Sequence, residues 1–188
     1  MVGHDSSKYP KYYNTGPLSE QLLHQEDLAK KFYLNLRQNL QNCLFFKPYM
    51  FKNWWLFNRY MEFFGKKKIL MDTNSFHTIL SESKIVVSLY PKTAFMQAFV
   101  SGPTILLINS SHYEETPKLE KIFKIMKKEK IAFENAEQAA RHINKIWDNV
   151  DAWWSSKKMK MLRKIISNEF GNSDDKYLLS WRKFIKKN

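Results

Sequence analysis

The 188-residue sequence is poor in cysteine and glycine, with one Cys and five Gly. The single cysteine, Cys43, excludes an internal disulfide, and its apolar neighbours predict an unreactive, buried thiol. The sequence has no glycine-rich phosphate loop and no nucleophile-elbow pattern, which argues against P-loop enzymes, protein kinases and serine hydrolases. The five histidines are scattered without the spacing of metal ligands, so we predict no metal site.

Long apolar runs are also missing. No stretch approaches the roughly 20 apolar residues that a membrane-spanning helix requires. The amino terminus lacks the apolar segment of a signal peptide. We therefore expect a cytoplasmic protein. Contact with the inner face of a membrane stays compatible with the sequence, because anionic headgroups attract basic, aromatic-rich chains.

Acidic residues are outnumbered: 18 Asp and Glu face 31 Lys and Arg, a net charge of +13. Such a charge favours anionic partners, but a lysine-rich solvated surface would give the same count. The hydrophobic content of 44% and the aromatic content of 15% are those of a folded domain, not of a disordered chain.

Short apolar runs alternate with segments of helical periodicity. The runs, which predict strands, lie at residues 43–46, 68–71, 84–90, 104–108 and 131–133, and the clearest is the Ile-Val-Val run at 85–87. Helices are predicted over residues 19–40, 51–64, 75–82 and 91–100, and again after Pro117 and after Asn135. Because strands alternate with helices, we predict an α/β fold: a Rossmann-like, three-layer domain with a parallel sheet.

This pattern divides the chain into three parts. Residues 1–18 are predicted to be an irregular amino-terminal segment and residues 19–154 the Rossmann-like domain, with its sheet-forming part in residues 42–154. Residues 155–188 are predicted to form helices packed on that domain. Their inward-facing side chains are predicted to include Leu162, Ile165, Ile166, Leu178, Leu179 and Phe184.

The most informative segment is the turn that follows the Ile-Val-Val strand. In open parallel sheets, ligands bind beyond the carboxyl ends of the strands, where helices present free backbone amides. A diphosphate at this turn would accept bonds from those amides, from the Thr93 hydroxyl and from the Lys92 ammonium. Gln97 lies one helical turn after Thr93 and would reach a sugar hydroxyl. The alternative is ordinary: Thr93 caps a helix, and Lys92 and Gln97 are solvent-facing.

The run SLYPKTAFMQAF at residues 88–99, followed by Gly102, Pro103, Thr104, Ile105 and Asn109, resembles a family of bacterial surface-polysaccharide and spore-coat-type transferases. Similarity continues through residues 112–115, 136–140 and 146–154. Upstream it includes residues 9–10, 16–17 and 47–48 together with Trp54. The resemblance covers most of the chain, and it rests on the order and separation of motifs that are individually loose.

This resemblance implies a carboxyl-terminal, donor-binding half of a GT-B-type glycosyltransferase. A nucleotide sugar would be the substrate, no cofactor would be needed, and a separate amino-terminal domain or chain would supply the acceptor side. Carried over by position, Thr93 and Gln97 would face the donor, with Lys47, Asn109 and Glu114 near the rim of the cleft. With Lys92 of the turn added, the predicted donor-binding residues are Lys47, Lys92, Thr93, Gln97 and Asn109, and the candidates for catalysis are His112 and Glu114.

The sequence departs from the family at two of these positions. Gln97 stands where the family has Glu, and Lys47 where it has Arg. An amide keeps hydrogen bonding but cannot act as a base, and lysine lacks the planar fork that grips a phosphate. The larger departure is length, because a GT-B enzyme needs two Rossmann-like domains and only a few polar residues precede the matching region. We therefore expect a chain that is incomplete as a catalyst alone. Since residues 1–8 show no strand ahead of Tyr9, we also expect a sheet that lacks one strand.

The alternative is a non-catalytic remnant or a basic interaction module that binds an anionic partner such as a nucleic acid. The closest approach to a basic stripe interleaved with aromatics is at residues 49–59, and it matches no known nucleic-acid-binding module. Nucleic acid is therefore the weaker of the two partner predictions.

Overall fold

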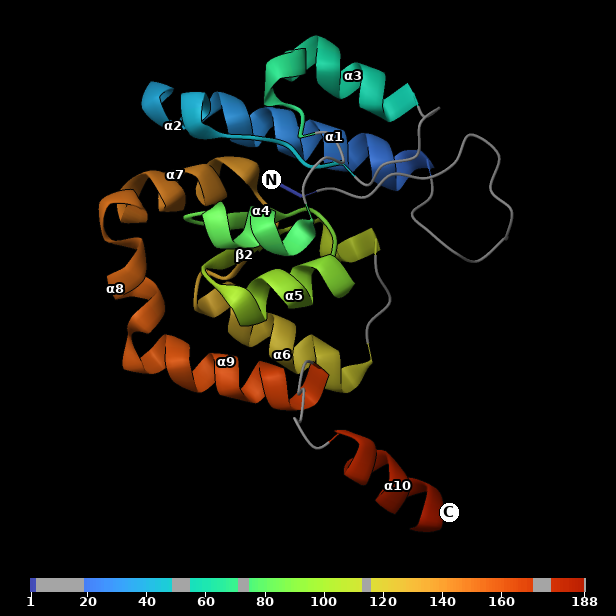
Figure 1. Ribbon diagram of the computed structural model, residues 1–188. Coiled ribbons are helices and arrows are strands. Elements are labelled where there is room, and N and C mark those ends of the chain that lie inside the picture. The colour runs from blue at the N-terminus through green and yellow to red at the C-terminus, as the bar shows by residue number, and fades with distance from the viewer. Residues whose placement is uncertain (3–18, 49–54, 71–74, 113–115, 171–176, 188) are drawn as a thin grey trace.

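The computed structural model describes residues 1–2, 19–48, 55–70, 75–112, 116–170 and 177–187 (Figure 1). Its centre is a parallel sheet of β1 (Val86–Ser88), β2 (Thr104–Leu107) and β3 (Ala132–Phe133), in the order β1-β2-β3. Helix α5 (Thr93–Ser101) connects the first pair of strands and α6 (Pro117–Lys128) the second. The predicted α/β, Rossmann-like class is confirmed.

Isolated bridges widen this sheet beyond β1. Val2 makes parallel bridges to Ser88 on one side and to Lys47 on the other, and Phe46 makes a parallel bridge to Ile69. The strands predicted at 43–46 and 68–71 are thus reduced to single bridges. Among the described residues, Val2 alone bridges both β1 and the Phe46–Lys47 segment, so a single residue stands there in place of a full strand.

The prediction of a buried thiol at Cys43 is wrong. Cys43 ends a short helix, α2 (Gln38–Cys43), and its side chain is exposed. The apolar run misled the prediction because the extended segment begins only after this helix, at Leu44. The first buried side chain of that segment is Phe46, which is fully buried.

Helices cover both faces of the sheet, because every residue of β2 is buried although successive side chains point to opposite faces. Ile105 and Leu107 pack on one face with buried residues of α1 (Ser19–Leu34), α3 (Trp55–Phe64) and α7 (Ala136–Ile146). Leu106 packs on the other face with residues of α5, α6 and α9 (Lys157–Phe170). Helix α4 (Phe76–Glu82) adds Leu80 against Val86 of β1. This makes three layers.

Several helix ends follow directly from the sequence. Ser75, Thr116 and Asn135 each accept a backbone N–H with the side chain at the start of α4, α6 and α7. At the other end, Gly65 stops α3 with φ of 83°, a conformation that favours glycine, and its N–H donates to Met61 O at 3.0 Å. A one-turn 3₁₀ helix, η1 (Lys66–Lys68), follows.

The single helix predicted over residues 19–40 is broken into α1 and α2. Asn144 of α7 lies at the break: its Nδ2 donates to Asn35 O at 3.0 Å, and its Oδ1 accepts from Arg37 N at 3.0 Å. A side chain more than a hundred residues away in the sequence therefore pairs with one carbonyl and one N–H at the break, groups that an unbroken helix would have paired internally. Leu36 and Leu40 are still buried.

Replacing Asn144 by alanine is expected to lower the free energy of unfolding by about 2 kcal/mol, because two hydrogen bonds of about 1 kcal/mol each are lost. Urea denaturation would measure the change. Asn149→Ala is the matched control, since Asn149 is exposed and makes no side-chain capping bond. Equal midpoints for the two variants would show that Asn144 does not hold the α1–α2 junction.

The carboxyl-terminal part contains η3 (Trp147–Asn149), α8 (Val150–Ser155), α9 and α10 (Tyr177–Lys187). Helix α9 buries Leu162 and Ile166 against the sheet layer, whereas Ile165 is 41% exposed. The prediction that Leu178, Leu179 and Phe184 face inward is wrong: all three are more than half exposed, and α10 projects from the body of the molecule (Figure 1).

Candidate functional site

The turn between β1 and α5 lies at the carboxyl edge of the sheet. Ser88, the last residue of β1, donates its hydroxyl to Tyr90 O at 2.9 Å, and Tyr90 N–H donates back to Ser88 Oγ at 3.4 Å. Lys92 N–H then donates to Tyr90 O at 3.0 Å. These bonds hold the turn in a compact form, so that α5 begins directly above the end of its strand.

The start of α5 differs from the starts of α4, α6 and α7 because no side chain of its own caps it. Thr93 is the first helical residue and not the cap, which corrects the ordinary alternative of the sequence analysis. The cap position belongs to Lys92, whose side chain has no acceptor and makes no capping bond. The backbone amides of the first turn therefore keep their donors for an anion at the carboxyl edge.

The side chains of this first turn are accessible. Lys92, Thr93 and Gln97 are exposed, and the last two lie one turn apart on the outer face of α5. The Lys92 ammonium lies over the Tyr90 ring, 5.0 Å from its centroid. This cation–π contact keeps the charge beside the turn while leaving it in solvent.

Two further candidates stand at the same edge of the sheet. Lys47 and Ser88 both bridge Val2, so they lie level with each other on either side of it, which separates their backbones by roughly 10 Å. Asn109 follows β2, whose Leu106 pairs with Ser88. The Asn109 Oδ1 accepts hydrogen bonds from the backbone N–H and the hydroxyl of Ser111, at 3.2 and 2.8 Å. The fold thus gathers the predicted donor residues at the ends of neighbouring strands.

A polar cluster beside Asn109 was not found by sequence reasoning. Ser110 and Lys127 both contact the carboxylate of Glu134, with Lys127 Nζ 2.9 Å from Glu134 Oε2. Burial alone would raise the pKa of Glu134, but these hydrogen bonds outweigh it and hold the pKa below its ordinary value. The available signal was position: Ser110 and Glu134 each come just after a strand of one parallel sheet.

The two candidates for catalysis are not placed by the structure. Glu114 lies outside the described residues. His112 ends the short helix η2 (Ser110–His112), and only its backbone is described. Both remain predictions.

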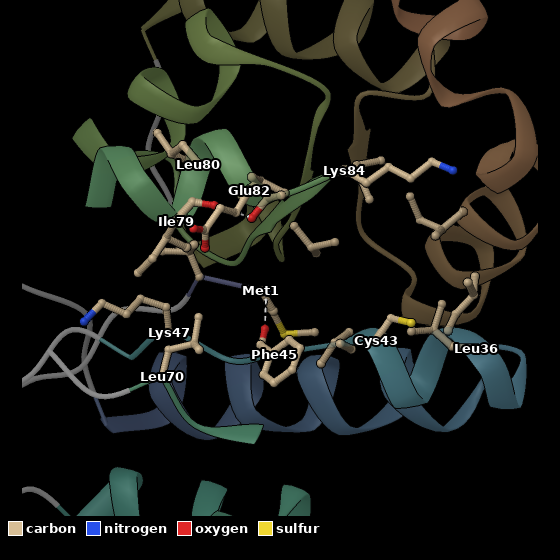
Figure 2. Close-up of a pocket in the computed structure, with 18 of the residues that line it drawn as sticks. Met1, Leu36, Cys43, Phe45, Lys47, Leu70, Ile79, Leu80, Glu82 and Lys84 are labelled. Atoms are coloured by element: carbon tan, nitrogen blue, oxygen red, sulfur yellow. Dashed lines mark hydrogen bonds between the residues drawn. The ribbon is translucent and has the colours of Figure 1, made fainter. Parts of the chain in front are cut away.

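A cavity of about 760 Å³ lies alongside β1 and the residues that lead into it, Lys84 and Ile85 (Figure 2). Its walls come from the two segments that flank Val2 in the sheet: Phe45 lies on one of them and Ile85 on the other. The amine of Met1 enters this cavity and donates to Phe45 O at 2.6 Å, and burial lowers the pKa of the amine to about 5. Of the five predicted donor residues, only Lys47 lines it. Because ligands of open parallel sheets bind at the carboxyl edge, we do not assign the donor to this cavity.

A second hollow, of about 780 Å³, lies between the end of α6 and α7 and is strongly basic. Burial, and then the charges of Lys130 and Lys145, lower the pKa of His142 in its wall to about 4. The cations that line this hollow are Lys128, Lys130, Arg141, Lys145 and Lys158.

Within the described parts of the chain, no three His, Cys, Asp or Glu side chains are grouped as ligands for a metal ion. No helix in those parts combines the length and apolar character needed to cross a bilayer.

Comparison with known proteins identifies one family. The model of the LIC12162 family transferases matches residues 1–185, nearly the whole chain. The chain therefore belongs to this transferase family, which confirms the resemblance at the level of a transferase. No curated protein and no solved structure matches it.

Proposed function

We propose that this member of the LIC12162 transferase family binds a nucleotide sugar at the carboxyl edge of its sheet, as the donor-binding part of a glycosyltransferase of surface polysaccharide assembly. The observation that carries the proposal is the start of α5. There, amides without a side-chain cap, an exposed threonine hydroxyl and a lysine side chain are adjacent at the carboxyl edge of the sheet, and a phosphate bound there would accept hydrogen bonds from them.

The neighbouring residues support the same assignment. Lys47 stands level with the end of β1 and adds a second cation on the far side of Val2. Gln97 extends along the outer face of α5, where an amide would hydrogen-bond a sugar or ribose hydroxyl. Asn109 lies at the end of the adjacent strand. Phosphate, sugar and base would thus be shared among the ends of several strands, as in other open parallel sheets.

Transfer itself breaks the bond between the sugar C1 and the diphosphate oxygen and forms a bond from C1 to an acceptor hydroxyl, whose proton passes to a base. Gln97 cannot be that base, because an amide does not accept a proton near neutral pH. The proposal assigns this chain to donor binding. A second domain or chain supplies the acceptor side in a GT-B-like arrangement.

The test uses nucleoside diphosphate sugars, such as UDP-glucose and GDP-mannose, and measures the saturable rise in the thermal unfolding temperature of the chain. Thr93→Pro is expected to weaken binding about tenfold or more, because it removes one N–H and the hydroxyl that contact the charged phosphate. Proline is tolerated at the first position of a helix, and α6 already carries Pro117 there. Lys92 is extended, as a residue before proline must be.

Two further variants complete the design. Thr93→Val keeps the amide and removes only the hydroxyl, so its loss of affinity should be smaller than that of Thr93→Pro. Lys160→Ala, an exposed lysine of α9, is the charge control for Lys92→Ala. Unchanged protection in Thr93→Pro and Lys92→Ala, with the fold intact, would contradict the proposed site.

The basic hollow around His142 favours a second candidate function, the binding of a polyanion. Binding through phosphate contacts depends steeply on salt, because condensed counterions are released. A chain that binds heparin and single-stranded RNA alike, with a steep salt dependence that Lys145→Ala and Arg141→Ala reduce, would favour this alternative over the sugar-donor site.

A further inference from the structure

Helix α10 exposes large apolar side chains along most of its length. All of its described side chains, residues 177–186, are exposed, and α10 extends away from the layered body in Figure 1. Trp181 is 62% exposed and Ile185 67%. A helix of 11 residues is marginal in water without tertiary packing, so a surface that covers this face would stabilise it.

The apolar residues of α10 form one stripe. The spacing i, i+1, i+4, i+7 and i+8 places them within a single face of the helix, and the Trp181 and Phe184 rings meet edge to face at 6.2 Å. Leu179 alone falls on the opposite side. The members of the stripe are Tyr177, Leu178, Trp181, Phe184 and Ile185.

The rest of α10 is cationic. Within residues 177–187 there are four basic residues and no acidic one, and the bases fall outside the apolar stripe. Helix α9 also combines an exposed apolar side chain with lysines on its outer side. Met161 is 64% exposed there, and the nearby Lys160 and Lys164 are exposed too. The basic residues of α10 are Arg182, Lys183, Lys186 and Lys187.

Charge decides between the surfaces that would cover this stripe. Pairing α10 with a second copy of itself would bring two sets of four cations together, which like-charge repulsion opposes. An anionic phospholipid surface satisfies both sides of the helix at once, because headgroup phosphates attract the lysines while the acyl boundary takes the apolar stripe. Tryptophan and tyrosine favour this boundary, since their rings are apolar and their N–H or O–H stays hydrated.

We propose that α10 binds the surface of an anionic phospholipid membrane, lying in its plane with the stripe of Tyr177, Leu178, Trp181, Phe184 and Ile185 inserted at the boundary of headgroups and acyl chains. The helix is far too short to span the bilayer, which needs about 20 residues. This inference does not depend on the sugar-donor site.

The experiment is co-sedimentation of the full chain with vesicles of phosphatidylcholine alone and of phosphatidylcholine mixed with phosphatidylglycerol. Binding is expected only to the anionic vesicles and should weaken as salt is raised. Trp181→Ser together with Phe184→Ser is expected to reduce the partition coefficient at least about tenfold, because two large apolar side chains no longer insert. The fold should survive, since both residues are exposed.

Leu179→Ser is the matched control, because it removes an exposed apolar side chain from the cationic side of the same helix and should leave binding unchanged. Sedimentation velocity of the chain without lipid tests the alternative, which is self-association through α10. The proposal is overturned if anionic vesicles do not bind the chain, if the Trp181 and Phe184 substitutions leave vesicle binding intact, or if they abolish instead a self-association that the unaltered chain shows.

Discussion

Arg59→Met is expected to lower the free energy of unfolding by about 3 kcal/mol, because it leaves a buried carboxylate with too few partners. Glu26 of α1 is 2% exposed, and Arg59 Nε of α3 lies 2.6 Å from its Oε2. Lys30 binds the other carboxylate oxygen. Once Arg59 is removed, Lys30 is the one cation among the described residues that still pairs with the buried carboxylate. Urea denaturation at neutral pH would measure the loss.

A double-mutant cycle separates the pair from the packing. Combining Glu26→Met with Arg59→Met removes the buried charge as well, so most of the lost stability should return. Lys124→Met is the control, because the Lys124–Glu120 pair is exposed on both sides and should contribute less than about 1 kcal/mol. If Arg59→Met and Lys124→Met lower the free energy of unfolding by the same amount, the ion pair with the buried Glu26 carboxylate does not hold α3 on α1.

The Glu26–Arg59 ion pair also holds in place a helix that supports the proposed donor site. Helix α3 places Tyr60 and Phe64 against Phe46, with the Tyr60 and Phe46 ring centroids 4.1 Å apart. Phe46 directly precedes Lys47, a predicted donor residue. Loosening α3 would therefore disturb one end of the proposed donor site without a direct contact, so Arg59→Met should also reduce the thermal protection that a nucleotide sugar gives.

Acidification from pH 6.5 to pH 4 is expected to lower the free energy of unfolding through His142 by about 3 kcal/mol. The folded pKa of His142 is about 4, below its ordinary 6.5, because burial and then Lys130 and Lys145 disfavour the imidazolium. Between these two values the unfolded chain binds the proton and the folded chain does not. Stability from this group is therefore complete above pH 6.5 and is lost as the pH falls toward 4.

His142→Phe is the matched variant, because the His142 ring packs between the Phe133 and Trp153 rings, with centroid distances of 5.4 and 5.3 Å. Within the described residues its buried Nε2 has no hydrogen-bond partner, so phenylalanine removes no hydrogen bond there. The difference in stability between the two proteins isolates this titration from that of the Met1 amine, whose pKa of about 5 affects the same range. A difference that does not change with pH would rule out a buried, neutral His142.

The sequence by itself determined the elements whose causes are local. Ser75, Thr116 and Asn135 start helices because their side chains reach amides only three residues away, and Gly65 ends one because it accepts a positive φ. The β-branched run before Ser88 and the apolar run after Pro103 became parallel strands covered on both faces. The order of residues alone also places Lys92, Thr93 and Gln97 just after the end of a strand.

Tertiary structure alone decided the features that depend on distant residues. The break after α1 comes from Asn144, more than a hundred residues away, and the Ser110, Lys127 and Glu134 cluster exists only because two strands end side by side. The exposure of the apolar stripe of α10 could not be predicted from the sequence. Such a stripe indicates that a surface covers the helix, but it does not show whether that surface belongs to the same chain. Periodicity is a local property, whereas burial is set by which surface the rest of the chain presents.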